Sequence, residues 1–114
     1  MQNVVLEVIE SYNEYLNKLP SGCIAIANKL RDDQIQSALS SVKDFSEGVI
    51  WLTEAAELLK KNEVNVTSNI DKIHEFLTEI NNALEIQDFH LVADLFEYEI
   101  AEFFEQYSRI VIEQ

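Results

Sequence analysis

Residues 35–59, IQSALSSVKDFSEGVIWLTEAAELL, carry the clearest structural signal in the chain, because their apolar residues recur at alternating spacings of three and four. This is the heptad pattern of a helix that buries one stripe against neighbouring helices. The stretch contains one glycine and no proline, so it has no strong helix breaker. It predicts one long helix. Its inward positions are Ile35, Ala38, Val42, Phe45, Val49, Leu52, Ala56 and Leu59.

The same spacing recurs in three further segments, one before this stretch and two after it. Short connections are expected near residues 31–33, 62–66 and 86–88, so successive helices are expected to run antiparallel. The sequence therefore predicts an all-α fold, an antiparallel up-down four-helix bundle, with residues 1–114 forming a single domain. The inward positions of the other three helices are Val5, Ile9, Tyr12, Leu16, Leu19, Cys23, Ile26 and Leu30; Val66, Ile70, Ile73, Leu77, Ile80 and Leu84; and Phe89, Ala93, Phe96, Ile100, Phe103, Tyr107 and Ile110.

The expected helix starts carry residues that accept hydrogen bonds from the free N–H groups of a first turn. Asp33 with Gln36 matches a capping box for the second helix, and Ser68 with Asp71 matches one for the third. Asp88 is expected to cap the fourth helix.

Pro20 is the one irregularity in the first helix. A proline inside a helix removes a hydrogen bond, so the helix is expected to be kinked or briefly interrupted near this residue. The apolar pattern keeps its phase from Leu19 to Cys23, which favours a single rod over two separate helices. Cys23 lies on the inward stripe, where a thiol is expected to behave as a small buried apolar group.

The charge limits the class of partner. The chain has 21 acidic residues against 8 Lys and Arg, and its net charge is −13. Nucleic acid and anionic membranes are therefore disfavoured as partners, whereas a basic protein is permitted. The single cysteine and the absence of a signal-peptide pattern after Met1 predict a cytoplasmic protein.

The sequence offers no constellation of catalytic residues. A di-metal carboxylate centre in a bundle needs two Glu-x-x-His motifs, and the nearest match is Asp71 with His74, present once. Cys23 has no histidine near it in the sequence, and two isolated glycines do not form a phosphate-binding loop. We therefore expect no enzymatic activity, no cofactor and no metal site.

A second apolar stripe runs along two of the predicted helices. Leu91, Leu95 and Tyr98 lie at i, i+4 and i+7, on a different side of the fourth helix from Phe96 and Ile100. A helix that is apolar on two sides is usually covered on both, either by its neighbours in the bundle or by a partner. Both interpretations stay open. The candidate partner-binding residues are Trp51, Ala55 and Leu58 in the second helix, with Leu91, Leu95, Tyr98, Glu97 and Glu102 in the fourth, where Asp94 and Glu105 extend the acidic rim.

The stretch ALEIQDFHLVADLFEYEI, residues 83–100, resembles a signature of small uncharacterised acidic helical-bundle proteins of Gram-positive bacteria, and WLTEAAELL, residues 51–59, is similar to them more loosely. The resemblance implies a helical bundle and no established activity. In size and helix content the chain is also similar to flagellar and secretion chaperones.

The function expected from these patterns is a non-enzymatic protein–protein interaction module, adaptor or chaperone-like, which binds a protein partner or a second copy of itself. One alternative is an acidic mimic of nucleic acid that binds a basic protein, and its binding would weaken strongly with added salt. A metal-carboxylate enzyme is the other, and it would require bound iron, manganese or zinc.

Overall fold

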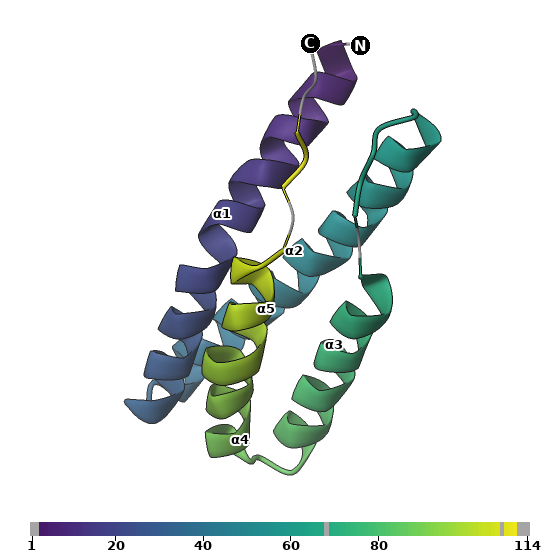
Figure 1. Cartoon of the computed structure of the whole chain (residues 1–114). Coiled ribbons are helices and arrows are strands. Elements are labelled where there is room, and N and C mark those ends of the chain that lie inside the picture. Colours follow the sequence, from purple (N-terminus) through teal and green to yellow (C-terminus); the bar gives the residue numbers. More distant parts are fainter. Residues whose placement is uncertain (1–2, 68, 108, 112–114) are drawn as a thin grey trace.

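The computed structural model describes residues 3–67, 69–107 and 109–111, and the regular elements in this part of the chain are all helical (Figure 1). Four helices follow one another, as the heptad pattern predicts. The fourth helix consists of three consecutive segments, of which the middle one, η1, is a π-helical turn. The elements are α1 (Asn3–Arg31), α2 (Ile35–Lys61), α3 (Ile70–Glu85), α4 (Phe89–Asp94), η1 (Leu95–Ile100) and α5 (Ala101–Glu105).

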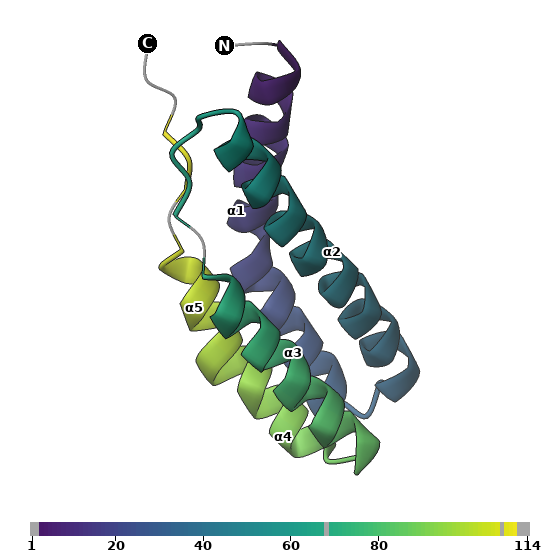
Figure 2. The ribbon, with the colours of Figure 1, turned by 90° about the vertical axis from the view of Figure 1, so that its right-hand side faces the viewer.

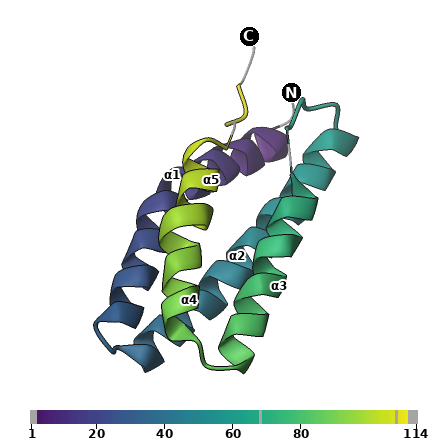
Figure 3. The ribbon, with the colours of Figure 1, turned by 60° about the horizontal axis from the view of Figure 1, so that its bottom comes forward.

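α1 is the central element of the packing. It contacts α2 on one side and all three segments of the fourth helix on another, whereas α3 packs mainly against the fourth helix (Figure 2). The turns at residues 32–34 and 86–88 lie at one end of the molecule (Figure 3). The connection at residues 62–67 lies at the other end, near the start of α1 and residues 109–111.

The predicted inward stripes of α1 and α2 are confirmed. All eight predicted positions of α1 are buried, and so are those of α2, except that Ile35 is partly buried. In the third segment the pattern is correct at Ile73 and Ile80, and also at Val66, which is buried in the connection before α3. Ile70 is partly buried, and the pattern is wrong by one position at Leu77 and Leu84. Phe76 and Ala83 are buried there, while Leu77 and Leu84 are only partly buried. The buried face of α3 is therefore rotated by one residue from the predicted face. On this rotated face, the Phe76 ring meets the Phe103 ring edge to face, with centroids 5.3 Å apart.

The fourth helix departs from the predicted register, because η1 widens one of its turns. The Ala101 N–H donates to the carbonyl of Phe96, five residues earlier, instead of to the residue four positions back. The core positions are therefore Phe96, Ile100 and Phe104, spaced by four, and the predicted inward Phe103 is only partly buried. The helix also ends at Glu105, so the predicted helical positions Tyr107 and Ile110 belong to the tail that follows it.

All three helix connections begin with the same motif. Asp33, Glu63 and Gln87 have φ angles of 63°, 65° and 57°, and each directly follows the cap of the helix before it. After α1, for example, the Gln34 N–H donates to the Lys29 carbonyl at 2.9 Å and the Asp33 N–H donates to Leu30, which is the Schellman arrangement. Polar side chains tolerate this left-handed conformation without a glycine.

Of the three predicted helix caps, one is confirmed, one is wrong and one falls outside the described residues. Asp88 caps the fourth helix through its Oδ1, which accepts from the Leu91 N–H at 3.1 Å. The box of Asp33 with Gln36 is wrong, because Asp33 lies in the left-handed turn after α1 and the residue before α2 is Gln34, whose side chain makes no cap. Ser68 lies outside the described residues, and Asn69 caps α3 by accepting from the Lys72 N–H at 3.3 Å.

α1 stays helical through Pro20, so it is a single helix, as the phase of the apolar pattern predicts, and it is not interrupted there. Proline has no N–H, and the carbonyl that it leaves without a helical partner is that of Leu16, four residues earlier. Arg109 from the C-terminal tail supplies the missing donor, with its Nη2 3.2 Å from the Leu16 carbonyl oxygen. The Arg109 Nε donates to the Asn17 side chain at 2.8 Å, which holds the guanidinium in place.

The tail makes a second attachment to α1 through Asn13. The Asn13 side-chain amide donates to the Ile110 carbonyl at 2.9 Å and its oxygen accepts from the Ile110 N–H at 2.8 Å. The amide therefore pairs with both backbone groups of Ile110, as a neighbouring strand would. The Ile110 side chain is buried, so the tail completes the core at this end of the bundle.

Candidate functional site

The structure separates the candidate partner-binding residues by burial. Leu95 and Ala55 are 3% and 6% exposed, so both belong to the core and are removed from the candidate surface. At these two positions, the second apolar side of the helix is covered by neighbouring helices of the bundle. Leu95 is the first residue of η1, and it is buried beside Phe96 in the core.

The remaining candidates lie on different surfaces. Trp51 packs edge to face on Tyr15 of α1, with ring centroids 6.2 Å apart, and Leu58 lines a hollow against Ile70 and His74 of α3. On the fourth helix, Tyr98 is 63% and Leu91 is 43% exposed. Among the described residues, the backbone of this helix does not lie next to the backbone of α2. The two predicted stripes are therefore not parts of one patch.

A groove between α1 and the fourth helix gathers three of the candidates, Glu97, Tyr98 and Glu102. Its volume is about 460 Å³, and we call it the α1/α5 groove. Apolar side chains from both helices line it, and carboxylates stand along the side of the fourth helix. The lining residues are Pro20, Ser21 and Ile24 of α1, with Glu97, Tyr98, Ala101, Glu102, Glu105 and Gln106.

Both helices that form the α1/α5 groove are irregular where they line it. Pro20 interrupts the hydrogen-bond ladder of α1, and Glu97 and Tyr98 belong to the π turn. Single π turns within α-helices are frequently found at functional sites. Within this turn Leu95 and Phe96 are buried, while Tyr98 is exposed at the surface.

The α1 side of the groove was not predicted. Ile24 is 37% exposed and lies one position off the inward stripe, next to Cys23. Pro20 and Ile24 are spaced as i and i+4, which is the signal that would have placed them on one face. The inward stripe through Leu19 and Cys23 lies about 100° around the helix from these two residues, so the stripe does not include them.

The positively charged side chain of Arg31 lies at one end of this surface. The Nη2 atom of Arg31, at the end of α1, lies 2.9 Å from Oδ1 of Asp94, and its Nη1 bonds to Oε1 of Glu97. The guanidinium carbon lies 5.9 Å from the centre of the Tyr98 ring, within the range of a cation–π contact. Hydrogen bonds from Tyr98 and from Arg31 lower the pKa of Glu97 below its ordinary value. The carboxylate is therefore ionised at neutral pH.

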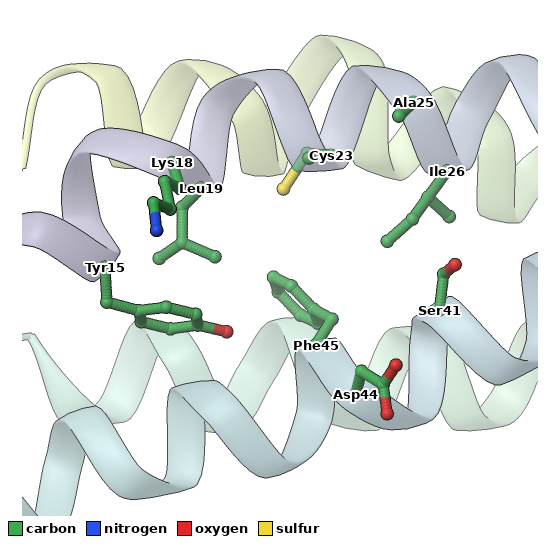
Figure 4. A pocket seen from close by; sticks show the side chains of 10 residues that line it. Tyr15, Lys18, Leu19, Cys23, Ala25, Ile26, Ser41, Asp44 and Phe45 are labelled. Atoms are coloured by element: carbon green, nitrogen blue, oxygen red, sulfur yellow. The ribbon is translucent and has the colours of Figure 1, made fainter.

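A second hollow of about 320 Å³ lies between α1 and α2 (Figure 4). Leu19, Cys23 and Ile26 of α1 face Phe45 of α2 across it. The Cys23 thiol is 1% exposed, and burial raises its pKa to about 12. The thiol is therefore protonated at neutral pH and a poor nucleophile, as expected for a buried apolar group.

The described residues contain no group of three or more His, Cys, Asp or Glu side chains placed to hold a metal ion. Across the same residues, none of the helices has the length and the apolar character needed to cross a bilayer.

These features define the class of the protein, a small all-helical domain with a surface groove. More particularly, a family model described as a domain of unknown function (DUF8042) matches residues 7–110, and the chain belongs to this family. Neither a curated protein nor a solved structure matches the chain. The resemblance of residues 83–100 to an uncharacterised family agrees with this membership in a family of unknown function.

Proposed function

We propose that this protein is a non-enzymatic interaction module that binds a basic amphipathic helix of another protein in the α1/α5 groove. The observation that carries the proposal is the combination of an apolar floor, from Ile24, Tyr98 and Ala101, with an acidic edge, from Glu102 and Glu105. Apolar anchors provide affinity in such grooves, and the charged edge selects the partner and speeds encounter. The net charge of −13 acts in the same direction.

The dimensions of the groove favour a helix as the occupant. On the fourth helix the lining residues run from Glu97 to Glu105, and eight residue steps of a helix extend roughly 12 Å. About two turns of a partner helix have that length, with anchors at i, i+4 and i+7. Lysine or arginine residues beside these anchors would face Glu102 and Glu105.

We also infer that the four helices form an antiparallel up-down bundle and that α1 bends at Pro20. Connections of three residues at 32–34 and 86–88 support the first inference, since short connections join antiparallel neighbours. The missing proline donor supports the second, because a helix can open on the side where a carbonyl lacks its helical donor.

The test is an NMR titration of the ¹⁵N-labelled chain with a synthetic helical peptide of about 14 residues, with Leu anchors on one face and Arg on its flanks. We expect the largest shifts at Ile24, Tyr98 and Glu102. Replacing Ile24 with Asp should weaken binding by about tenfold or more, because a buried carboxylate would face the apolar anchors. Leu58→Asp is the matched control on another surface, and it should leave binding unchanged.

Shifts concentrated around Trp51 and Leu58, or equal losses from Ile24→Asp and Leu58→Asp, would overturn the assignment of the groove. A control peptide with Glu in place of Arg should bind at least about tenfold more weakly. If binding instead ignores the Leu anchors and disappears with moderate salt, the surface acts by charge alone, as an acidic mimic of nucleic acid would. Light scattering without peptide tests the other occupant, since a dimer in which Ile24 is protected would mean that the groove holds a second copy of the chain.

A further inference from the structure

The cluster of Arg31, Asp94, Glu97 and Tyr98 has the composition of a binding site for a guanidinium group. Two carboxylates bond to separate nitrogens of Arg31, and the ring of Tyr98 lies beside the same group. Carboxylates and aromatic faces are the groups that arginine prefers in recognition sites. In this structure the guanidinium comes from the protein's own α1.

The cluster is continuous with the α1/α5 groove. Glu97 and Tyr98 line the groove and also contact Arg31. Further along the same edge, Glu102 and Glu105 are exposed and form no ion pair within the part of the chain that the structure describes. At one end of the acidic edge, Asp94 and Glu97 are therefore paired with Arg31, whereas Glu102 and Glu105 at the other end can accept a cation from a partner.

Arg31 is also placed so that it can leave without disturbing the core. It is the last residue of α1, and its side chain is 32% exposed. The core at this end is closed by Ala27 and Leu30, which are 0% and 5% exposed and are independent of the guanidinium. Exposed ion pairs contribute little to stability, so releasing Arg31 to water costs little.

Resting on the function proposed above, we propose that Arg31 is an intramolecular placeholder, which an arginine of the partner helix displaces from Asp94, Glu97 and Tyr98 on binding. The exchange replaces one guanidinium by another, so the carboxylates keep a cation throughout. The released Arg31 remains near the end of α1, where a positive charge interacts favourably with the helix dipole. The partner must then carry an arginine at the end of its helix that lies beside Asp94.

The experiment measures the affinity of the Leu/Arg peptide for the full chain and two variants. Arg31→Gln removes the competitor, and we expect this variant to bind about threefold to tenfold more tightly than the wild type. Lys43→Gln is the matched control, because it also removes one positive charge but lies exposed on α2, away from the groove. It should bind like the wild type.

A second measurement separates this role from a structural one. In Arg31→Gln, the pKa of the Glu97 carboxyl, followed by NMR, should rise from its lowered value, and the Leu/Arg peptide should lower it again. A peptide with Gln in place of the terminal Arg should leave it raised. Melting temperatures of the two variants should agree, since the core beside Arg31 is intact.

The outcomes are distinguishable. Equal affinities for the wild type and Arg31→Gln, or an Arg31→Gln chain that binds more weakly, would overturn the placeholder while leaving the groove assignment in place. Failure of every chain to bind would overturn both proposals. Binding by Arg31→Gln alone would support the placeholder in its strongest form, since Arg31 would then close the groove in the wild type.

Discussion

Two helices of this bundle leave the regular α-helical ladder, α1 at Pro20 and the fourth helix at η1, and the two irregularities differ in how they are resolved. At Pro20 a hydrogen bond is missing, and Arg109 from the tail supplies another donor to the Leu16 carbonyl. In η1 the turn is one residue wider, and the side chains after it move to new positions in the core. The first irregularity is repaired from outside its helix, whereas the second changes the register of its own helix. Both line the same groove.

The largest effect is expected from the register of the fourth helix. Phe104→Ala should lower the free energy of unfolding by about 3 to 5 kcal/mol, because Phe104 is fully buried and its loss opens a cavity. Phe103→Ala should cost clearly less, since Phe103 is only partly buried. Urea denaturation of both variants checks the difference. A larger loss from Phe103→Ala would mean that the helix keeps its heptad register and has no wide turn.

Leu95 and Leu91 provide a test of the face on which the sequence predicted a single apolar stripe. Leu95→Ala should destabilise the chain by about 2 to 5 kcal/mol, whereas Leu91→Ala should cost less than about 1 kcal/mol because Leu91 is 43% exposed. Thermal and urea unfolding measure both. If both variants lose less than about 1 kcal/mol of unfolding free energy, Leu95 is exposed, and Leu91, Leu95 and Tyr98 form one continuous surface stripe.

The smallest effect concerns the repair at Pro20. In a double-mutant cycle, Arg109→Gln should be more destabilising in the wild type than in a Pro20→Ala background, by about 0.5 to 1.5 kcal/mol, which is the range for one hydrogen bond. Alanine at position 20 restores the N–H that bonds the Leu16 carbonyl, so this carbonyl no longer depends on Arg109. Additive losses in urea denaturation would show that Arg109 acts independently of the proline.

The contrast between the two irregularities also explains which features could be predicted from the sequence. The inward stripes of α1 and α2 were correct, because heptad spacing is sufficient where helices keep regular turns. Pro20 was visible as a residue, but its partner Arg109 is 89 positions away and carries no local signal. The wide turn at η1 has no residue that marks it. The error at Phe103, which follows the wide turn, therefore began there.

The candidate site was predicted on one side only. The acidic residues Glu97, Glu102 and Glu105, and Tyr98 between them, follow from the pattern of the fourth helix. Ile24 and Arg31 do not, since which helix lies beside Tyr98 depends on the packing of the whole bundle. Periodicity identifies the faces of a helix but does not pair them across a fold.

The attachment of the tail to α1 has a consequence for how the chain acquires its structure during synthesis. Asn13 meets Ile110 across 97 residues, and Arg109 meets Leu16 across 93, so α1 is synthesised first among the four helices and completed last. Contacts of such separation form late, because a long loop must close first. α1 and α2 can pair early, whereas the Leu16 carbonyl lacks its donor until Arg109 is synthesised and the apolar face of α1 is uncovered until the fourth helix packs on it. A nascent chain is therefore expected to expose that face until residues 89–110 have emerged, and to depend during that interval on another molecule that covers it.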